Sequence, residues 1–139
     1  MLDNRSTRLI DAAASLVGEF ELSHHSTAGA VGAALRTRAG NIYTGICMHM
    51  SCGIGSCAEH GAVVEMLKHR ETDIEEIVAV NRDGIITPCG RCRELLVQTA
   101  PGNLQTRVIV DATTSIPLAE LMPLHWLEIK AQQRQREAS

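Results

Sequence analysis

Two short segments of the sequence contain residues that could carry chemistry. Cys57 and Glu59 stand at the start of one predicted helix, and Pro88, Cys89 and Cys92 stand at the start of another. Because a strand is predicted before each helix, both helix N-termini can lie at one edge of a sheet. The positive ends of two helix dipoles favour thiolates and lower cysteine pKa values there. The sequence therefore predicts a cluster of reactive sulfur atoms.

Three thiolates that can surround one ion suit zinc. Cys89 and Cys92 are three residues apart and share a helix face, so they can chelate one ion, while Cys57 can supply a third sulfur from the other helix. Three protein ligands leave a fourth position, which holds water in catalytic zinc sites, and zinc lowers the pKa of that water to roughly 7 in favourable sites. Glu59 could carry protons to and from that water without binding the metal.

Two arginines next to the second motif are candidates for tuning such a site. Three thiolates outweigh the charge of one zinc ion, which would weaken the metal as a Lewis acid. Arg91 and Arg93 flank Cys92, and they could offset this negative charge by contacts outside the ligand shell.

The elements that must position these residues follow from hydrophobic periodicity and turn residues. The predicted helices cover residues 6–20, 57–70, 88–99 and 124–136, with a short helical turn at 118–121. The predicted strands cover residues 31–37, 42–48, 74–80 and 107–110, of which the first two form a hairpin. Strands alternating with helices predict an α/β fold with both sheet faces covered. We expect one domain over residues 1–139, with a polar, frayed tail at about 132–139.

The composition excludes several classes of function. The chain has 139 residues, of which 45% are hydrophobic and only 2% aromatic, and its net charge is −3. Binding of polymeric nucleic acid is not expected, because it needs positive charge or rows of aromatic rings. No apolar run approaches the ~20 residues of a membrane span, and the polar start lacks a signal-peptide core. With five cysteines, an odd number, these features predict a cytoplasmic protein whose thiols are metal ligands or catalytic groups.

The two motifs together resemble the signature of the zinc-dependent cytidine deaminase superfamily, in its all-cysteine branch. Residues 31–35 and 42–45 resemble the first hairpin of small cytidine deaminases, and residues 88–96 (PCGRCRELL) are especially similar to the blasticidin S deaminases. The Leu-Met-Pro at 121–123, shortly before Trp126, resembles them as well. The resemblance extends from about residue 8 to residue 126.

This resemblance implies a fold, a reaction and an assembly. The fold is a three-layer α/β/α sandwich around a mixed five-stranded sheet. The reaction is hydrolytic deamination of a small amino-heterocycle, such as a cytosine-containing nucleoside or an analogue, with release of ammonia. Cys57, Cys89 and Cys92 would bind Zn²⁺, and Glu59 would transfer the protons. Small members of the family are commonly homotetramers, so a homo-oligomer is expected.

The sequence departs from the family where cytidine deaminases bind the nucleoside. An Asn and a Glu usually contact the ribose hydroxyls, but the corresponding positions are Cys47 and His49 here. The stretch 29–30 is Gly-Ala where a Phe usually lines the base pocket. Cys47, His49, Ala58 and Trp126 are the candidate substrate-binding residues, and plain cytidine is not expected to be the optimal substrate.

Three alternatives compete with a deaminase. The cysteines could form a structural zinc site, for which Cys52 or His60 could be the fourth ligand. Cys89 and Cys92 open a helix as a redox dithiol does, so a thiol oxidoreductase is possible. A catalytically silent ligand-binding relative would also retain the motifs. Metal content and ammonia release distinguish these readings.

Overall fold

The computed structural model describes residues 2–139, and its centre is a mixed sheet of seven strands. Five strands run in the order β3-β2-β4-β6-β7, while β1 pairs with the start of β2 and β5 pairs with the end of β4. Only β4 and β6 are parallel. The strands are β1 Phe20–Glu21, β2 Thr27–Thr37, β3 Ile42–His49, β4 Ile74–Asn81, β5 Gly84–Ile86, β6 Arg107–Ile109 and β7 Ser115–Pro117. The predicted mixed sheet is confirmed, with two strands more than the five expected.

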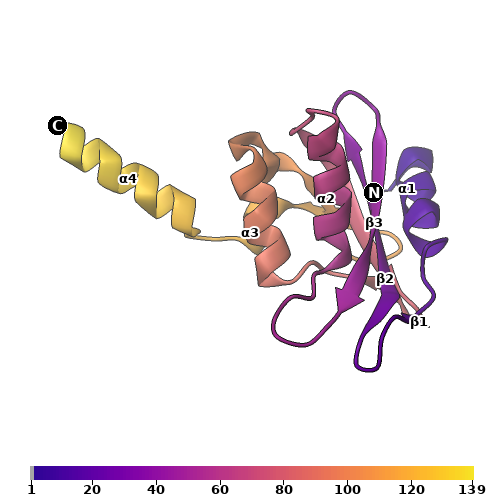
Figure 1. Ribbon diagram of the computed structural model, residues 1–139. Coiled ribbons are helices and arrows are strands. Elements are labelled where there is room, and N and C mark those ends of the chain that lie inside the picture. Colours follow the sequence, from indigo (N-terminus) through magenta and orange to yellow (C-terminus); the bar gives the residue numbers. More distant parts are fainter. Residues whose placement is uncertain (1) are drawn as a thin grey trace.

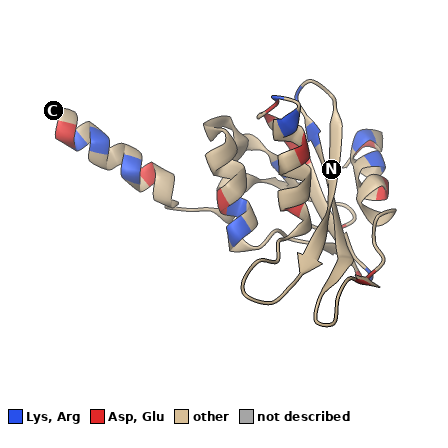
Figure 2. Ribbon diagram, in the orientation of Figure 1, with Lys and Arg blue, Asp and Glu red and all other residues tan. Residues whose placement is uncertain are grey.

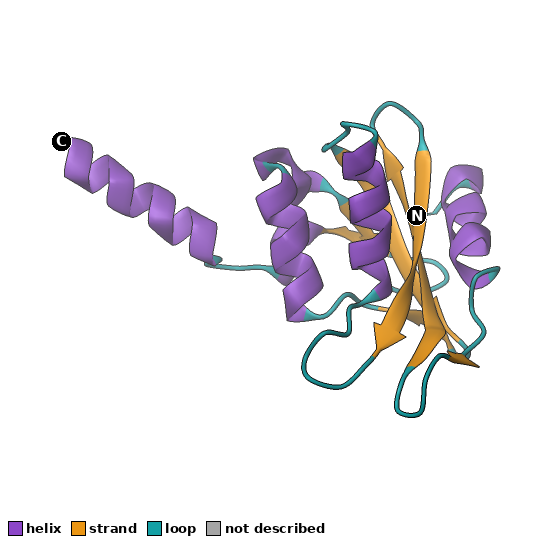
Figure 3. Ribbon diagram, viewed as in Figure 1, coloured by secondary structure: helices purple, strands orange, loops and turns teal. Residues whose placement is uncertain are grey.

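Helices cover both faces of this sheet, as Figures 1 and 3 show. The α-helices are α1 Asn4–Ala14, α2 Ala58–Lys68, α3 Gly90–Thr99 and α4 Trp126–Ala138, and the 3₁₀ helices are η1 Pro101–Gln105 and η2 Leu118–Leu121. α1 lies on one face, and α2 and α3 lie side by side on the other. The predicted three-layer α/β/α arrangement is therefore confirmed.

Alternation along the central strands explains why both faces are covered. In β4, Val78 and Val80 pack in the core beneath α1, whereas Ile77 joins the larger core beneath α2 and α3. In β2, Ala34 and Leu35 divide between the two cores in the same way. A strand that is buried on both faces reads as a continuous apolar run, which is how residues 77–80 (Ile-Val-Ala-Val) appear in the sequence.

The N-terminal helix differs from the prediction at both ends. Its cap is Asp3, whose Oδ1 accepts a 2.9 Å hydrogen bond from the Ser6 backbone N–H, so the helix begins at Asn4, before the predicted start at residue 6. The helix ends at Ala14 instead of continuing to residue 20, because Phe20 pairs with Ala28 in the first two strands. Hydrophobic periodicity could not locate this switch from helix to strand.

The C-terminal helix α4 projects from the body of the molecule (Figure 1). None of its residues is buried, and it carries both basic and acidic residues along its length (Figure 2). It continues to Ala138, through the residues for which a frayed tail is predicted. No helix within residues 2–139 combines the length and the apolar character needed to cross a membrane.

Candidate active site

Two helix N-termini bring the predicted cysteines together. Cys57 is the N-cap of α2 and Cys89 is the N-cap of α3, and both have extended backbones. Neither side chain caps its helix by a hydrogen bond, so both sulfur atoms remain available for another partner. Cys92, one turn into α3, is buried between the two helices.

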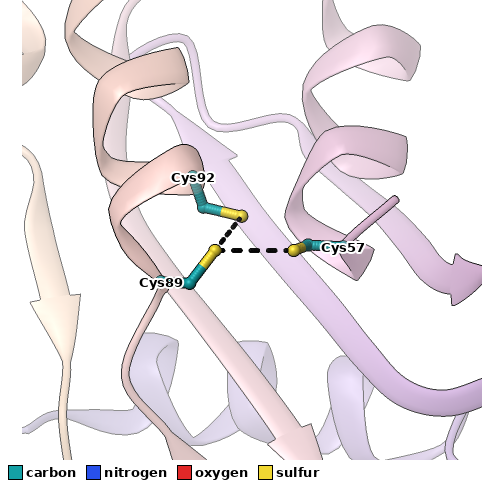
Figure 4. A group of neighbouring side chains, drawn as sticks. All are labelled: Cys57, Cys89 and Cys92. Carbon is teal, nitrogen blue, oxygen red and sulfur yellow. Dashed lines mark hydrogen bonds between the residues drawn. The ribbon is translucent and has the colours of Figure 1, made fainter. Parts of the chain in front are cut away.

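The three sulfur atoms form a compact cluster (Figure 4). Sγ of Cys89 lies 3.5 Å from Sγ of Cys57 and 3.6 Å from Sγ of Cys92, and all three atoms lie within 4.8 Å of one another. Zinc–sulfur bonds of about 2.3 Å in a tetrahedral site place sulfur atoms roughly 3.8 Å apart. All five cysteines are free thiols. The donor set and its spacing therefore fit a zinc ion.

Glu59 lies at the base of the same site, in the first turn of α2. The residue is buried, with 4% of its surface exposed, and burial raises the pKa of its carboxyl group. Burial also raises the pKa of Cys92, and the nearby Glu59 charge adds to the effect. For Cys89 burial raises the pKa, but N–H groups at the start of α3 and the neighbouring thiols outweigh it, so the pKa is lowered. Glu59 and Cys92 are thus buried, Cys57 is partly buried and Cys89 is exposed, so the site extends from the interior to the surface.

A pocket of about 390 Å³ opens above Glu59 and Cys57. Several other residues named from the sequence also line it, from one strand and two helices: Cys47, His49, Ala58 and Arg91. The pocket is of the size that small-molecule sites occupy. The structure therefore brings the expected metal ligands and most of the expected substrate-binding residues to one place.

A β-bulge shapes one wall of this pocket. The pairing of β2 with β3 shifts register between Ala28 and Gly32. Within the bulge the backbone N–H of Val31 donates a 3.2 Å hydrogen bond to Sγ of Cys47. Bulges re-aim side chains beside functional sites. Cys47 thus has a structural partner as well as a position on the pocket wall.

The two arginines of the second motif differ in their contacts. Nη1 of Arg91 donates to the carbonyl of Gly55 at 3.4 Å, at the pocket. Arg93 lies away from the pocket; its Nε donates to the Pro88 carbonyl at 2.8 Å and its Nη1 to the Leu121 carbonyl at 3.1 Å. Arg93 therefore ties the turn before α3 to the end of η2.

Trp126 is not brought to the pocket within one chain. It starts α4 with 58% of its surface exposed, and it lines hollows beyond α3 instead. The proposed fourth ligands also lie apart from the sulfur cluster: Cys52 is in an exposed loop, and neither it nor His60 belongs to the metal-binding group found among residues 2–139. His60, expected at the surface, has its Nε2 buried without a hydrogen-bond partner in the described chain.

Glu19 is a pocket residue that sequence reasoning missed. It precedes β1 in a segment for which the sequence predicts a helix, and it lines the same pocket as Arg91 and His49. Only the pairing of residues 20–21 with residues 27–28 brings it there, and this pairing has no clear sequence signal.

Comparison with known proteins agrees with the geometry of the site. A blasticidin-S deaminase of Bacillus cereus is 31% identical over 108 residues, covering 69% of this chain and 76% of that protein. A probable cytidine deaminase of Dictyostelium discoideum is 37% identical over 71 residues, covering 49% of this chain and 48% of that protein. No protein-family model matches the sequence.

Solved structures show the same fold. The cytidine deaminase of Mycobacterium tuberculosis superposes with a TM-score of 0.73 at 24% identity, covering 89% of this chain and 98% of that chain. The cytidine deaminase of Bacillus anthracis gives 0.71 at 22% identity, covering 96% and 98%. The protein is thus an aminohydrolase with the cytidine deaminase fold. The chain belongs to the family of blasticidin-S and cytidine deaminases, enzymes of the zinc type.

Proposed function

We propose that the protein hydrolyses the exocyclic amine of a small, cytosine-like heterocycle and releases ammonia. The observation that carries this proposal is the placement of Glu59 beside three clustered thiols at the base of a substrate-sized pocket. A structural zinc site has no need of a buried carboxylate beside an open pocket. The family relationship supports the same reaction.

Cys57, Cys89 and Cys92 would hold the zinc ion, which when bound activates water as a nucleophile. The start of α2 and the start of α3 fix the sulfur positions before metal binds. The helix dipoles stabilise the negative charge of the thiolates. We propose that Arg91 and Arg93 position the segments around the zinc ligands. Arg93 holds the Pro88 carbonyl next to Cys89, and Arg91 holds the loop at Gly55.

We assign proton transfer to Glu59. Its burial raises the pKa of the carboxyl group, which favours a group that both accepts and returns a proton. It would take a proton from water and deliver it to the ring nitrogen. It would then take a second proton from the hydroxyl that has added to the ring carbon and deliver it to the amine, so that the C–N bond breaks, a carbonyl forms and ammonia leaves. Of the two acids that line the pocket in the described chain, Glu59 and Glu19, only Glu59 is buried beside the thiols, so we assign both steps to its carboxyl group.

The pocket walls support a cytosine-containing nucleoside or nucleoside analogue other than plain cytidine. Cys47 and His49 provide no carboxylate for ribose hydroxyls, and Cys47 is already engaged by the Val31 N–H. Ala58 contributes a small side chain at the pocket, which leaves room for a flat ring. The two sequence relatives are a blasticidin-S deaminase and a probable cytidine deaminase, so blasticidin S and cytidine belong in the panel to be tested.

The test compares ammonia release by zinc-loaded wild type and Glu59→Gln on cytidine, deoxycytidine, cytosine and blasticidin S. We expect wild type to deaminate at least one of them, and the variant to lose about 10²–10⁴-fold in rate. Both proteins should bind one zinc per chain, because Glu59 is not a proposed ligand. A wild type that is fully zinc-loaded and inactive on a broad panel of amino-heterocycles would overturn the proposal. A metal-free protein that reduces disulfides would identify a thiol oxidoreductase instead.

We also propose that the protein forms a homo-oligomer, as the family resemblance implies a tetramer. The projecting α4 supports this, because Leu124 and Trp126 at its start and Ile129 within it are exposed. Such apolar side chains on an isolated helix are typical of an association surface.

A further inference from the structure

Cys89 and Cys92 have the arrangement of a redox dithiol as well as that of two zinc ligands. Cys89 is the N-cap of α3 and Cys92 lies in its first turn, so two residues separate them. A Cys-X-X-Cys motif at the start of a helix is typical of proteins that form reversible disulfides. Zinc binding does not exclude this chemistry, because the cysteine thiolate is both the metal ligand and the nucleophile in oxidation.

The two thiols differ in their access to solvent. Cys89 is exposed, whereas Cys92 is fully buried between α2 and α3. An oxidant dissolved in water therefore meets Cys89 first, and the Cys92 thiol lies behind it. An accessible cysteine with a second thiol beside it is the usual arrangement of a reversible oxidation site.

The distances place two thiols within reach of Cys89. Its sulfur lies between the other two, at 3.5 Å from Sγ of Cys57 and 3.6 Å from Sγ of Cys92 (Figure 4). A disulfide needs its sulfur atoms about 2.05 Å apart, so either partner has to approach by about 1.5 Å.

Cys92 is the better placed of these two partners. Cys89 and Cys92 share one helix start, so rotation of their side chains can bring the sulfur atoms together. A bridge from Cys89 to Cys57 has to draw the starts of two helices together, and the backbone of α2 is already in direct contact with β3 at Gly45. The fold therefore favours a disulfide within α3.

We propose that Cys89 is a site of reversible oxidation by peroxides, and that Cys92 converts the oxidised Cys89 to a disulfide. First, the Cys89 sulfur attacks a peroxide oxygen; the S–O bond forms, the O–O bond breaks, and the sulfur is oxidised to a sulfenic acid. The Cys92 sulfur then attacks the Cys89 sulfur; the S–S bond forms and the S–O bond breaks as hydroxide leaves. With hydrogen peroxide, two thiols and one peroxide give one disulfide and two water molecules, so both electrons pass to the peroxide.

This disulfide removes two of the three proposed zinc ligands. A disulfide supplies no thiolate, so within the sulfur cluster only Cys57 remains as a ligand. Because zinc sites in proteins need at least three protein ligands, oxidation should release the metal, and reduction should restore the site. Only the accompanying loss of deamination rests on the proposed function; the disulfide and the release of zinc do not.

The test adds hydrogen peroxide to the zinc-loaded full-length protein. Released zinc is followed with a chelating dye, and disulfides are located by mass spectrometry of alkylated peptides. We expect one zinc to be released for each Cys89–Cys92 disulfide, and zinc binding and ammonia release to return after addition of dithiothreitol and zinc. Cys57→Ser should form the same disulfide. Cys92→Ala should instead keep a sulfenic acid at Cys89, which dimedone traps.

Cys52→Ser is the matched control, because Cys52 is also exposed but does not belong to the sulfur cluster found within residues 2–139. This variant should release zinc and form the disulfide as wild type does. Oxidation of Cys52 while Cys89 stays reduced, or a bridge from Cys89 to Cys57 in place of Cys92, would make this inference wrong while the proposed function stands. If the disulfide forms and zinc leaves, but the zinc-loaded protein deaminates nothing before oxidation, the inference holds and the proposed function fails.

Discussion

Tyr43, the only tyrosine in the chain, is engaged at the edge of the sheet away from the active site. Its hydroxyl donates a short hydrogen bond to Oε2 of Glu71, which also accepts from Asn41, and its ring stacks on His69. The bond to Glu71 raises the pKa of Tyr43 to about 12, and the same bond lowers the pKa of Glu71. Each group therefore holds the other in its ordinary charge state at neutral pH.

The hydrogen bond between Tyr43 and Glu71 predicts that the stability of the folded protein falls as the pH rises from about 10 to about 12. A tyrosine whose pKa is raised on folding stabilises the folded protein below its unfolded pKa of 10, and that contribution is lost as the pH rises towards about 12. Ultraviolet titration of tyrosinate reports Tyr43 alone. We expect the folded protein to titrate near 12 and Glu71→Gln to titrate closer to 10. Denaturation midpoints of Tyr43→Phe should fall less between pH 10 and 12 than those of wild type. Titration of folded wild type at the ordinary value would contradict the assignment.

Arg36 and Glu76 form an ion pair inside the protein, at 3.0 Å, with side chains only 7% and 5% exposed. Ser6 of α1 also donates to Glu76, at 2.9 Å, so the pair joins the helix to two strands. Removal of one partner leaves a buried charge without compensation, which typically costs about 3–5 kcal/mol, whereas removal of both often costs little. Urea denaturation should show a large loss for Arg36→Met and a much smaller loss for Arg36→Met with Glu76→Leu.

The exposed pair between Lys68 and Glu65 is the control for this experiment. Its N–O distance is also 3.0 Å, but its side chains are 65% and 42% exposed, and it shares no residue with the buried pair. Ion pairs in water contribute about 0–1 kcal/mol, so Lys68→Met should change the free energy of unfolding by no more than that. Equal losses for Lys68→Met and Arg36→Met would show that burial does not set the strength of these pairs.

At the scale of elements, α2 reaches the site because small residues let it lie directly on β3. A Cβ at Gly45 would lie 2.4 Å from both the Ala58 carbonyl oxygen and the Ala62 nitrogen, and Gly61 faces Gly45 from the helix. Since these neighbours are backbone atoms, they cannot move without moving the helix. The first turn of α2, with Cys57 and Glu59, is thus positioned by direct contact between the backbones of α2 and β3.

The contact at Gly45 predicts that even a small side chain at this position lowers both the stability of the protein and its affinity for zinc. Gly45→Ala should lower the free energy of unfolding by at least about 1–3 kcal/mol, the usual cost of overpacking, and should weaken zinc binding because α2 carries Cys57. Gly102→Ala is the control: nothing lies within 4 Å of its added Cβ, and its φ is not positive. We expect the control to remain within about 0.5 kcal/mol of wild type in urea denaturation. An unchanged stability and zinc affinity in Gly45→Ala would exclude the positioning role of this contact.

The elements also show what the sequence could and could not predict. The sequence could predict the grouping of Cys57, Cys89, Cys92 and Glu59 because they lie in two short motifs at the starts of helices. Such motifs can be recognised without knowledge of tertiary contacts. The three-residue strands β5 and β7 were missed because neither has an apolar run like residues 108–110 (Val-Ile-Val), which identified the equally short β6. Glu19 was missed because its position depends on the pairing of β1 with β2 and on a bulge, which are set by tertiary contacts.

For the whole molecule, the scarcity of aromatic residues determines how the layers pack. The buried core consists of aliphatic and small residues, with no aromatic among its fully buried members within residues 2–139. The backbone of α2 comes close to β3 at Gly45, and the backbone of α1 comes close to β2 at Gly32. Helices with small residues at these contacts can lie nearer to the sheet than helices that carry large side chains there. The three rings are correspondingly outside the core: Phe20 and Trp126 are exposed, and Tyr43 is half-buried.

The single tryptophan makes the proposed assembly measurable, because Trp126 is 58% exposed at the start of the projecting α4. If α4 lies in the interface of a homo-oligomer, association removes that indole from water, as expected for a large aromatic at an interface. Acrylamide quenching should therefore decrease as protein concentration rises, in step with the oligomer fraction from sedimentation velocity. Leu124→Ser, which exchanges an apolar side chain that is 78% exposed, should shift both curves to higher concentration. An oligomer in which Trp126 remains fully quenchable would place the interface elsewhere, leaving α4 free.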